Sequence, residues 1–487
     1  MINISRSLVG PALLMMVSTG LGPLVSCGGG SKESTEAKSA ASPGEPASKE
    51  GSEAPSATAS GEHDSTEKTV ENAYIYGYPM MVLDMTKQVT GKGVTNHLAY
   101  LPKPPDATFK DVVRPNVDTL YTTAFLDLTA EPVLFHMPDT RGRYYVSQLL
   151  DANTNVFSAP GKRTTGTGAK DFAIVGPGWK GTLPNGVTRI DSPTNDAWLL
   201  SRIQVNGEKD AAAVNALQRE QKMAPLSEWP ARAIAAEPVQ PAPAPKTSPE
   251  QQVEAMEAND YFNKLAMLMR ANPPAAADAP TTQQFAKIGL VPGLPFRPND
   301  DVTDVLDKAK THALSTIKAK AAQLGTEQNG WRWVTSDVGT YGTDYTQRAA
   351  VTYFGLGANL PEDAVYPSVA QDSNGEALDG TKHYLLHFDR DKIPPVKAFW
   401  SVTAYDKDGF LIANSINRFA ARDSELKKNP DGSVDILLQA DSPGADRQAN
   451  WLPVAKGRPF NLLLRMYWPD KVVVDGKYTP PAVRVAQ

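Results

Sequence analysis

The sequence predicts a multidomain chain that is mainly β, with a helical part between two β-sandwiches. Forty prolines and 36 glycines among 487 residues favour many turns and short strands over one long helical bundle. Short runs of alternating apolar and polar residues, separated by turn signals, fill both halves of the chain, as is typical of sandwiches. Between these halves, two stretches repeat apolar residues at helical spacing.

The first 26 residues predict a lipoprotein signal peptide. A short basic start and an apolar run lead to the sequence LVSC, which ends at Cys27, the single cysteine of the chain. This pattern resembles the lipobox of bacterial lipoproteins, which implies cleavage before Cys27 and lipidation of its sulfur and amino group by acyl chains such as palmitate. The alternative is an uncleaved membrane helix, but glycines and prolines in the run and the lack of a basic flank after it argue against that. A single cysteine also excludes internal disulfides and thiolate metal clusters.

Residues 27–66 predict a disordered tether, because they are mainly Gly, Ser, Glu, Lys, Ala and Pro. Residues 66–85 follow a helical pattern that meets a Gly-Tyr-Pro break. The expected strands of the N-terminal module, residues 67–236, are 120–128, 144–150, 172–175 and 198–205.

A proline-rich connector is expected at residues 237–249, which read EPVQPAPAPKTSP. Residues 250–344 predict a helical domain with helices at 250–269 and 302–324 around a proline-rich interruption at 272–280. Residues 345–487 predict the second sandwich. Its expected strands are 384–388, 398–405, 434–439 and 460–468.

Each half of the chain carries a set of distinctive motifs. Those of the first half are RPNVDTLY at 114–121, YYVSQ at 144–148 and WLLSR at 198–202. Those of the second half are YLLHF at 384–388, PPVKAFWSVTAY at 394–405, NPDG at 429–432 and NWLP at 450–453. Together they resemble a two-part bacterial family, the domains of unknown function 1254 (N-terminal) and 1214 (C-terminal). The resemblance implies an N-terminal immunoglobulin-like sandwich, an α-helical middle domain and a C-terminal jelly-roll-like sandwich, but no activity.

The first candidate site lies at the start of the strand after Pro115. In an extended chain Arg114, Asn116 and Asp118 point the same way, since side chains alternate with period two, and Tyr121 follows closely. These groups could bind or polarise a carboxylate, sugar or carbonyl ligand. The alternative is an Arg–Asp pair and an Asn that fix an irregular loop.

Further residues complete the candidate set. Trp198 and Arg202 share one face, either as a ligand site or as a core tryptophan with an arginine at its rim. Trp400, Tyr405 and Arg465 lie on strands with polar-aromatic and apolar faces, and the polar face is either solvent-exposed or a concave site for a carbohydrate or small polar ligand.

The sequence gives little support for binding of nucleic acid, metal ions or a dinucleotide cofactor. The formal net charge of −5 excludes a general attraction to nucleic acid. His383 and His387 are too far apart on a strand for shared metal ligation. GPGWKG at 176–181 matches a dinucleotide motif, but no helix signal follows, so we expect a hairpin turn. We therefore expect no cofactor; the loops 372–376 and 406–409 carry oxygen ligands suited to calcium, or are ordinary turns.

Two functional hypotheses follow. The first is a lipid-anchored lipoprotein of the bacterial cell envelope, on the periplasmic face or cell surface, that binds a small polar or carbohydrate-like ligand or an envelope partner. The second is a cofactor-independent enzyme acting on a small polar substrate at an interdomain site, with Asp118 as base and Arg114 or Tyr121 stabilising negative charge. The lack of a recognisable nucleophile, cofactor loop or metal motif favours binding.

Overall fold

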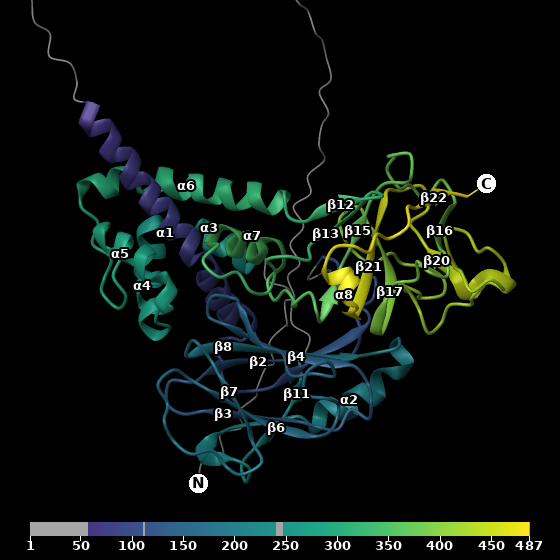
Figure 1. Ribbon diagram of the computed structural model, residues 1–487, viewed down its shortest axis with the longest axis horizontal. Helices are drawn as coiled ribbons and strands as arrows, with labels where there is room; N and C mark the ends of the chain where they lie inside the picture. Colours follow the sequence, from purple (N-terminus) through teal and green to yellow (C-terminus); the bar gives the residue numbers. More distant parts are fainter. Residues whose placement is uncertain (1–56, 111–112, 240–246, 487) are drawn as a thin grey trace, which may run out of the picture.

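The computed structural model describes residues 57–110, 113–239 and 247–486. Within these ranges, a group of helices is flanked by β-sheets that form an N-terminal pair and a C-terminal pair (Figure 1). The predicted signal peptide, Cys27 and the tether up to residue 56 lie outside the described residues. The tether was expected to reach residue 66, but helix α1 already begins at Ala57.

Helix α1 (Ala57–Thr90) runs diagonally through the helical region (Figure 1). The break expected after residue 76 is absent, because the helix continues through Gly77 and Pro79. Gly77 serves a tertiary contact instead: a Cβ there would lie 2.3 Å from Cδ2 of Leu265. Burial of Tyr74, Tyr76 and their neighbours stabilises the helix despite the proline.

The N-terminal region contains a pair of sheets with a shared hydrophobic core. The outer face of the first sheet is covered by the helices, which explains why β2, β4 and β8 are buried on both faces. The first sheet has the order β11 (Glu237–Pro238), β1 (Ala99–Tyr100), β2 (Thr119–Asp127), β8 (Asp196–Gln204), β4 (Tyr145–Asp151), β5 (Val156–Ser158). The second has the order β10 (Ile234–Ala235), β9 (Lys222–Pro225), β3 (Val133–Met137), β6 (Lys170–Val175), β7 (Thr188–Asp191). Helix α2 (Ala211–Glu220) and the short helices η1 (Glu208–Asp210) and η2 (Leu226–Glu228) lie between the strands in sequence.

The helical region is more divided than expected. The helix predicted over 250–269 is broken near Met256, whose carbonyl accepts a hydrogen bond from Lys310. Ser248 and Asn299 cap the helices that follow them, as their side chains accept backbone N–H bonds. The helices are α3 (Pro249–Ala255), α4 (Ala258–Ala271), η3 (Ala276–Asp278), α5 (Ala279–Lys287), α6 (Asp300–Ala322) and α7 (Tyr345–Gly355).

The C-terminal region contains another pair of sheets with a common core. All four strands predicted here are present, two of them with the predicted bounds. The larger sheet has the order β12 (Thr326–Gln328), β13 (Trp331–Trp333), β15 (Ser368–Val369), β21 (Phe460–Pro469), β17 (Val396–Asp406), β18 (Ala420–Arg422), with β14 (Ala364–Val365) also paired to β21. The smaller has the order β20 (Trp451–Pro453), β19 (Val434–Gln439), β16 (Tyr384–Phe388), β22 (Arg484–Val485). The short helices η4 (Ala445–Asn450) and α8 (Lys471–Val474) complete it.

The structure thus confirms a mainly β chain with helices, built on several sheets; the domain division and the immunoglobulin-like and jelly-roll-like topologies stay predictions. The hairpin expected at 176–181 is wrong, because β6 and β7 on either side of this loop pair in parallel. None of the helices in the described residues combines the length and apolar character that a membrane crossing needs.

Candidate functional site

A pocket of about 270 Å³ lies where the N-terminal sheets, the helical region and the C-terminal sheets meet. Strands β2 and β8 of the N-terminal region, helices α6 and α7, and strands β13 and β21 of the C-terminal region all contribute to its wall. Six of the residues named from the sequence line this pocket: Arg114, Asn116, Tyr121, Trp198, Arg202 and Arg465. Asp118, Trp400 and Tyr405 do not.

Arg202 projects from β8 and is only 6% exposed. Its guanidinium donates to the side-chain oxygens of Gln148 and Asn359, and Nη2 donates to the Gly357 carbonyl at 2.9 Å. It also lies over the Tyr121 ring, 5.1 Å from the centroid. All of these partners are neutral, and Nε has no partner in the described structure.

Gly357, on the loop after α7, is required at this position. Its φ is +81°, and an added Cβ would lie 3.2 Å from side-chain carbons of Leu200 and Trp198. The glycine therefore lets the loop carbonyl approach Arg202 without displacing the tryptophan.

The hydrogen-bond partners of Arg465, on β21, are also neutral. Nη1 donates to Thr403 Oγ1 at 2.7 Å, and Nη2 donates to the Tyr405 hydroxyl at 2.6 Å. Weaker bonds from Nη2 reach the carbonyls of Arg114 and Pro115 at 3.2 and 3.3 Å. Arg465 thereby links the C-terminal sheet to the turn that carries Arg114.

Arg114 adopts a left-handed backbone with φ of +52°, a strained conformation for a residue with a side chain. Its N–H donates to the Gly409 carbonyl at 2.6 Å. In the described structure its buried Nε has no hydrogen-bond partner. Burial lowers the pKa of the Arg114 guanidinium, the nearby Tyr405 opposes this, and the like charge of Arg465 lowers the pKa further.

Asn116 orients two phenols beside these arginines. Its Nδ2 donates to the hydroxyls of Tyr121 and Tyr467 at 3.3 and 2.9 Å, and its Oδ1 accepts the Asp118 N–H at 2.8 Å. This last bond folds the segment into a turn. The segment is therefore not extended, and the prediction that Arg114, Asn116 and Asp118 point the same way is wrong.

Asp118 lies beneath the pocket with no exposed surface. Its Oδ1 accepts a bond from Arg422 Nε at 3.0 Å, and its Oδ2 accepts the Ser401 hydroxyl. Both carboxylate oxygens are therefore engaged, in the buried ion pair that the sequence left open as the alternative, although the partner is Arg422 rather than Arg114.

The polar face of β17 is neither solvent-exposed nor a ligand surface. Ser401, Thr403 and Tyr405 are fully buried. Tyr405 donates to the Pro115 carbonyl at 2.8 Å, so this face docks on the N-terminal region. Trp400 lies on the opposite face, in the hydrophobic core, with its ring centroid 5.1 Å from that of Phe388.

The charged side chains that line the pocket are all cationic. Five cationic side chains line it, and no Asp or Glu of the described residues does. Arg114, Arg202 and Arg465 form no ion pair with a carboxylate of the described chain. The Tyr366 hydroxyl, which accepts a bond from Asn359, does not compensate, because burial raises its pKa and keeps it neutral. Removing an ion from water costs several kcal/mol, so a buried arginine cluster without a directly paired carboxylate is unusual.

The sequence analysis did not identify the pocket residues that lie, along the chain, between α6 and β15. Asn359 and Tyr366 complete the polar end, and Phe354 and Leu356 line the apolar section. No local pattern marks these residues, because tertiary packing alone brings them to β8 and β21.

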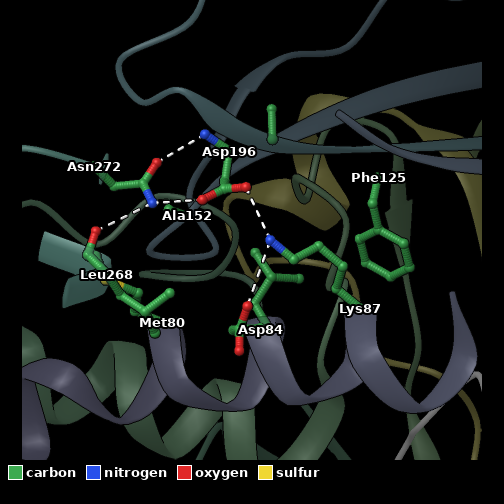
Figure 2. A pocket seen from close by; sticks show the side chains of 10 residues that line it. Met80, Asp84, Lys87, Phe125, Ala152, Asp196, Leu268 and Asn272 are labelled. Carbon is green, nitrogen blue, oxygen red and sulfur yellow. Dashed lines mark hydrogen bonds and ion pairs between the residues drawn. The ribbon is translucent and has the colours of Figure 1, made fainter. Parts of the chain in front are cut away.

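A second cavity, of about 20 Å³, lies between α1, β8 and α4 (Figure 2). Lys87 lies between Asp84 and Asp196, with Nζ–O distances of 3.4 and 3.0 Å. Asn272 donates to Asp196 Oδ2 at 2.7 Å (Figure 2). This cavity is large enough for about one water molecule.

The remaining candidates for metal chemistry have protein partners. His387 Nδ1 lies 2.5 Å from Asp435 Oδ1 and its Nε2 lies 3.2 Å from Asp389. Asp372 and Asp406 each accept backbone N–H bonds within their own loops, as in ordinary turns. Among the residues that the structure describes, no group of three or more His, Cys, Asp and Glu could hold a metal ion.

Comparison with solved structures shows the fold. The VPA0106 protein from Vibrio parahaemolyticus is 24% identical with a TM-score of 0.70, and the match covers 87% of this chain and 100% of that chain. An uncharacterized protein from Burkholderia cenocepacia is 13% identical with a TM-score of 0.41, over 88% of this chain and 95% of that one. No curated protein sequence matches the chain.

Two family models match the sequence. Residues 95–225 match the protein of unknown function DUF1254, and residues 363–471 match the protein of unknown function DUF1214. Both matches fall in the order expected from the motifs, and each contributes residues to the pocket. The resemblance is confirmed, because the chain carries an N-terminal match to DUF1254 and a C-terminal match to DUF1214.

Proposed function

We propose that the chain binds a small organic anion in the pocket between its N-terminal, helical and C-terminal regions. Arg114, Arg202 and Arg465 recognise the anionic group, and the apolar wall holds the rest of the ligand. The observation that carries the proposal is the absence of any carboxylate partner for these arginines among the described residues. A bound anion would supply the missing negative charge, and guanidinium groups bind carboxylates through charge-assisted hydrogen bonds.

The size and lining of the pocket support a small ligand. Its volume of about 270 Å³ lies just below the range typical of sites for drug-sized ligands. Leucine, valine and aromatic side chains dominate its wall, with a few convergent polar groups at one end. This composition favours an organic acid over a carbohydrate, which would need polar partners along its whole length.

Binding is favoured over catalysis. Asp118, the base of the enzyme hypothesis, has both carboxylate oxygens engaged and does not line the pocket. Among the described residues, the lining also contains no Asp, Glu, His or Cys. Proton transfer by a side chain of ordinary pKa near neutrality is therefore not supported there.

The anchored envelope location remains within the proposal and rests on the LVSC sequence that ends at Cys27. Acylation would fix the binding domains to a membrane, since each buried methylene contributes about 0.8 kcal/mol. Cys27→Ser should move the protein from the membrane to the soluble fraction of cells, measured by fractionation and mass spectrometry of the N-terminus. An unmodified Cys27 in the wild-type protein would refute the anchor.

The test of binding is calorimetric titration of the full chain with octanoate, benzoate and glucose. We expect an acid to bind and glucose not to bind. Arg114→Met should weaken binding of the acid at least tenfold, whereas the exposed Arg219→Met, which removes the same charge elsewhere, should not change it. Failure of both acids to bind, or equal affinity in Arg114→Met, would refute the proposal.

A further inference from the structure

We infer that the ligand is a monoanion with a single apolar tail, inserted with its charged group innermost. This inference rests on the proposed function and narrows it to one class of ligand, the aliphatic or aromatic monocarboxylates. It depends on the difference between the two ends of the same pocket.

The cations at the outer end already have partners. Lys318 Nζ lies 2.8 Å from Glu254 and 5.6 Å from the centre of the Tyr353 ring. Arg332 Nη2 lies 3.4 Å from Glu327, and its Nη1 donates to the Ala322 carbonyl at 3.0 Å. Arg332 thus binds the last carbonyl of α6, as basic residues commonly do at helix ends. Neither cation needs an anion from the ligand.

Exposure separates the two ends. The Lys318 and Arg332 side chains are each 43% exposed, whereas Arg202 and Arg465 are 6% and 2% exposed. A charged group in water gains little from an exposed cation, but much from a cation that is already desolvated. The anionic group therefore belongs at the inner end.

The wall between the two ends is apolar. Ala321, Leu324, Trp333, Val351 and Leu356 are buried, and Phe354 lies partly buried beside them. A second carboxylate placed along this wall would lose water without gaining a partner. An alkyl or aryl tail would instead gain from every carbon that it buries.

The register of the strands gives the distance between the outer and inner ends of the pocket. Arg332 pairs with Ser368, and Ser368 pairs with Leu463, two residues before Arg465 on β21. Two strand spacings and a two-residue step place the Cα atoms of Arg332 and Arg465 about 12 Å apart. A monocarboxylate of medium length would span this distance from the inner arginines to the outer end.

The experiment compares three probes of equal length in calorimetric titrations of the full chain: octanoate, octanedioate and 1-octanol. We expect octanoate to bind at least tenfold more tightly than either of the others. Arg332→Gln should change octanoate affinity less than twofold, in contrast to Arg114→Met. Lys318→Gln serves the same purpose if Arg332→Gln fails to fold, because Arg332 also binds the end of α6.

The outcomes separate the two proposals. Octanedioate binding as tightly as octanoate, or a tenfold loss of octanoate affinity in Arg332→Gln, would overturn the orientation and the monoanion class. The proposed function would survive either result if Arg114→Met still weakened binding. If no acid binds at all, the proposed function fails first and the inference fails with it.

Discussion

Two of the cavities in the described structure differ in how their buried charges are paired. In the small cavity of Figure 2, Lys87 has two carboxylate partners and Asp84 binds a second lysine, Lys264, at 2.7 Å. In the pocket of about 270 Å³, three arginines contact only hydroxyls, amides, carbonyls and aromatic rings of the described residues. A charge network that is complete within the protein indicates a structural role, whereas an incomplete one points to a ligand. This contrast predicts that substitutions in the two cavities change the free energy of unfolding by different amounts and in opposite directions.

The largest effect is expected at Asp118, which lies beneath the pocket. Like the charged groups of the small cavity, its carboxylate is fully paired within the protein. Asp118→Asn removes the buried carboxylate from Arg422 and leaves it only the exposed Glu425 at 3.3 Å, so the free energy of unfolding should fall by about 3 kcal/mol. Urea denaturation measures this change. A loss of ligand binding with unchanged stability would instead give Asp118 a direct role in the site and would break the comparison.

A smaller loss is expected in the small cavity. Lys87→Met removes the cation between Asp84 and Asp196 and should lower the free energy of unfolding by about 2 kcal/mol, because both carboxylates are partly buried. Lys209→Met, at an exposed lysine, is the matched control and should have almost no effect. Equal values for both variants in urea denaturation would contradict a structural role for the network.

A gain in stability, rather than a loss, is expected from substitution of Arg114. Arg114→Met replaces an uncompensated, largely buried cation with an apolar side chain, so the ligand-free protein should gain about 1 kcal/mol of stability. Thermal unfolding without ligand measures the gain. Destabilisation would mean that Arg114 has a structural role and would weaken the distinction between the two cavities.

The smallest effect concerns a histidine on the protein surface. The hydrogen bond with Asp435 raises the pKa of His387, and its proximity to Asp389 adds to this. Since the folded-state pKa lies above the unfolded value, the stabilisation is present below about pH 6.5 and is lost as pH rises through the folded-state pKa. His387→Gln should therefore lower the melting temperature more at pH 5.5 than at pH 8.5. A difference independent of pH would contradict this linkage.

The elements that the sequence predicted well are those whose local pattern matches their tertiary environment. Strands β16 and β19 alternate between buried and half-buried residues and were predicted with their observed bounds. The pattern failed where packing between distant segments decides the structure. Gly77 and Pro79 are typical of a helix break in sequence, but Gly77 admits Leu265 of α4 and the helix continues.

For the candidate site, the sequence identified individual residues but not how their side chains are paired or oriented. Arg114 was identified at the start of a strand, Arg202 by its spacing from Trp198, and Arg465 by the alternation of its strand, although the three are far apart in the chain. Their shared lack of carboxylate partners depends on the fold and has no signal in the sequence. The orientation of Asp118 was also beyond a period-two argument, because the Asn116 side chain turns the backbone before β2 begins.

The position of the pocket relative to the two family regions has a consequence for recognition of the proposed ligand. Arg114 and Arg202 lie within the DUF1254 match and Arg465 within the DUF1214 match, whereas the wall from Lys318 to Asn359 lies in the segment between them that neither match covers. If the proposed function holds, substitutions in that segment of this chain would reshape the space for the tail without altering the arginines proposed to bind the head group. The two parts of the proposed ligand would then be recognised by separate stretches of sequence.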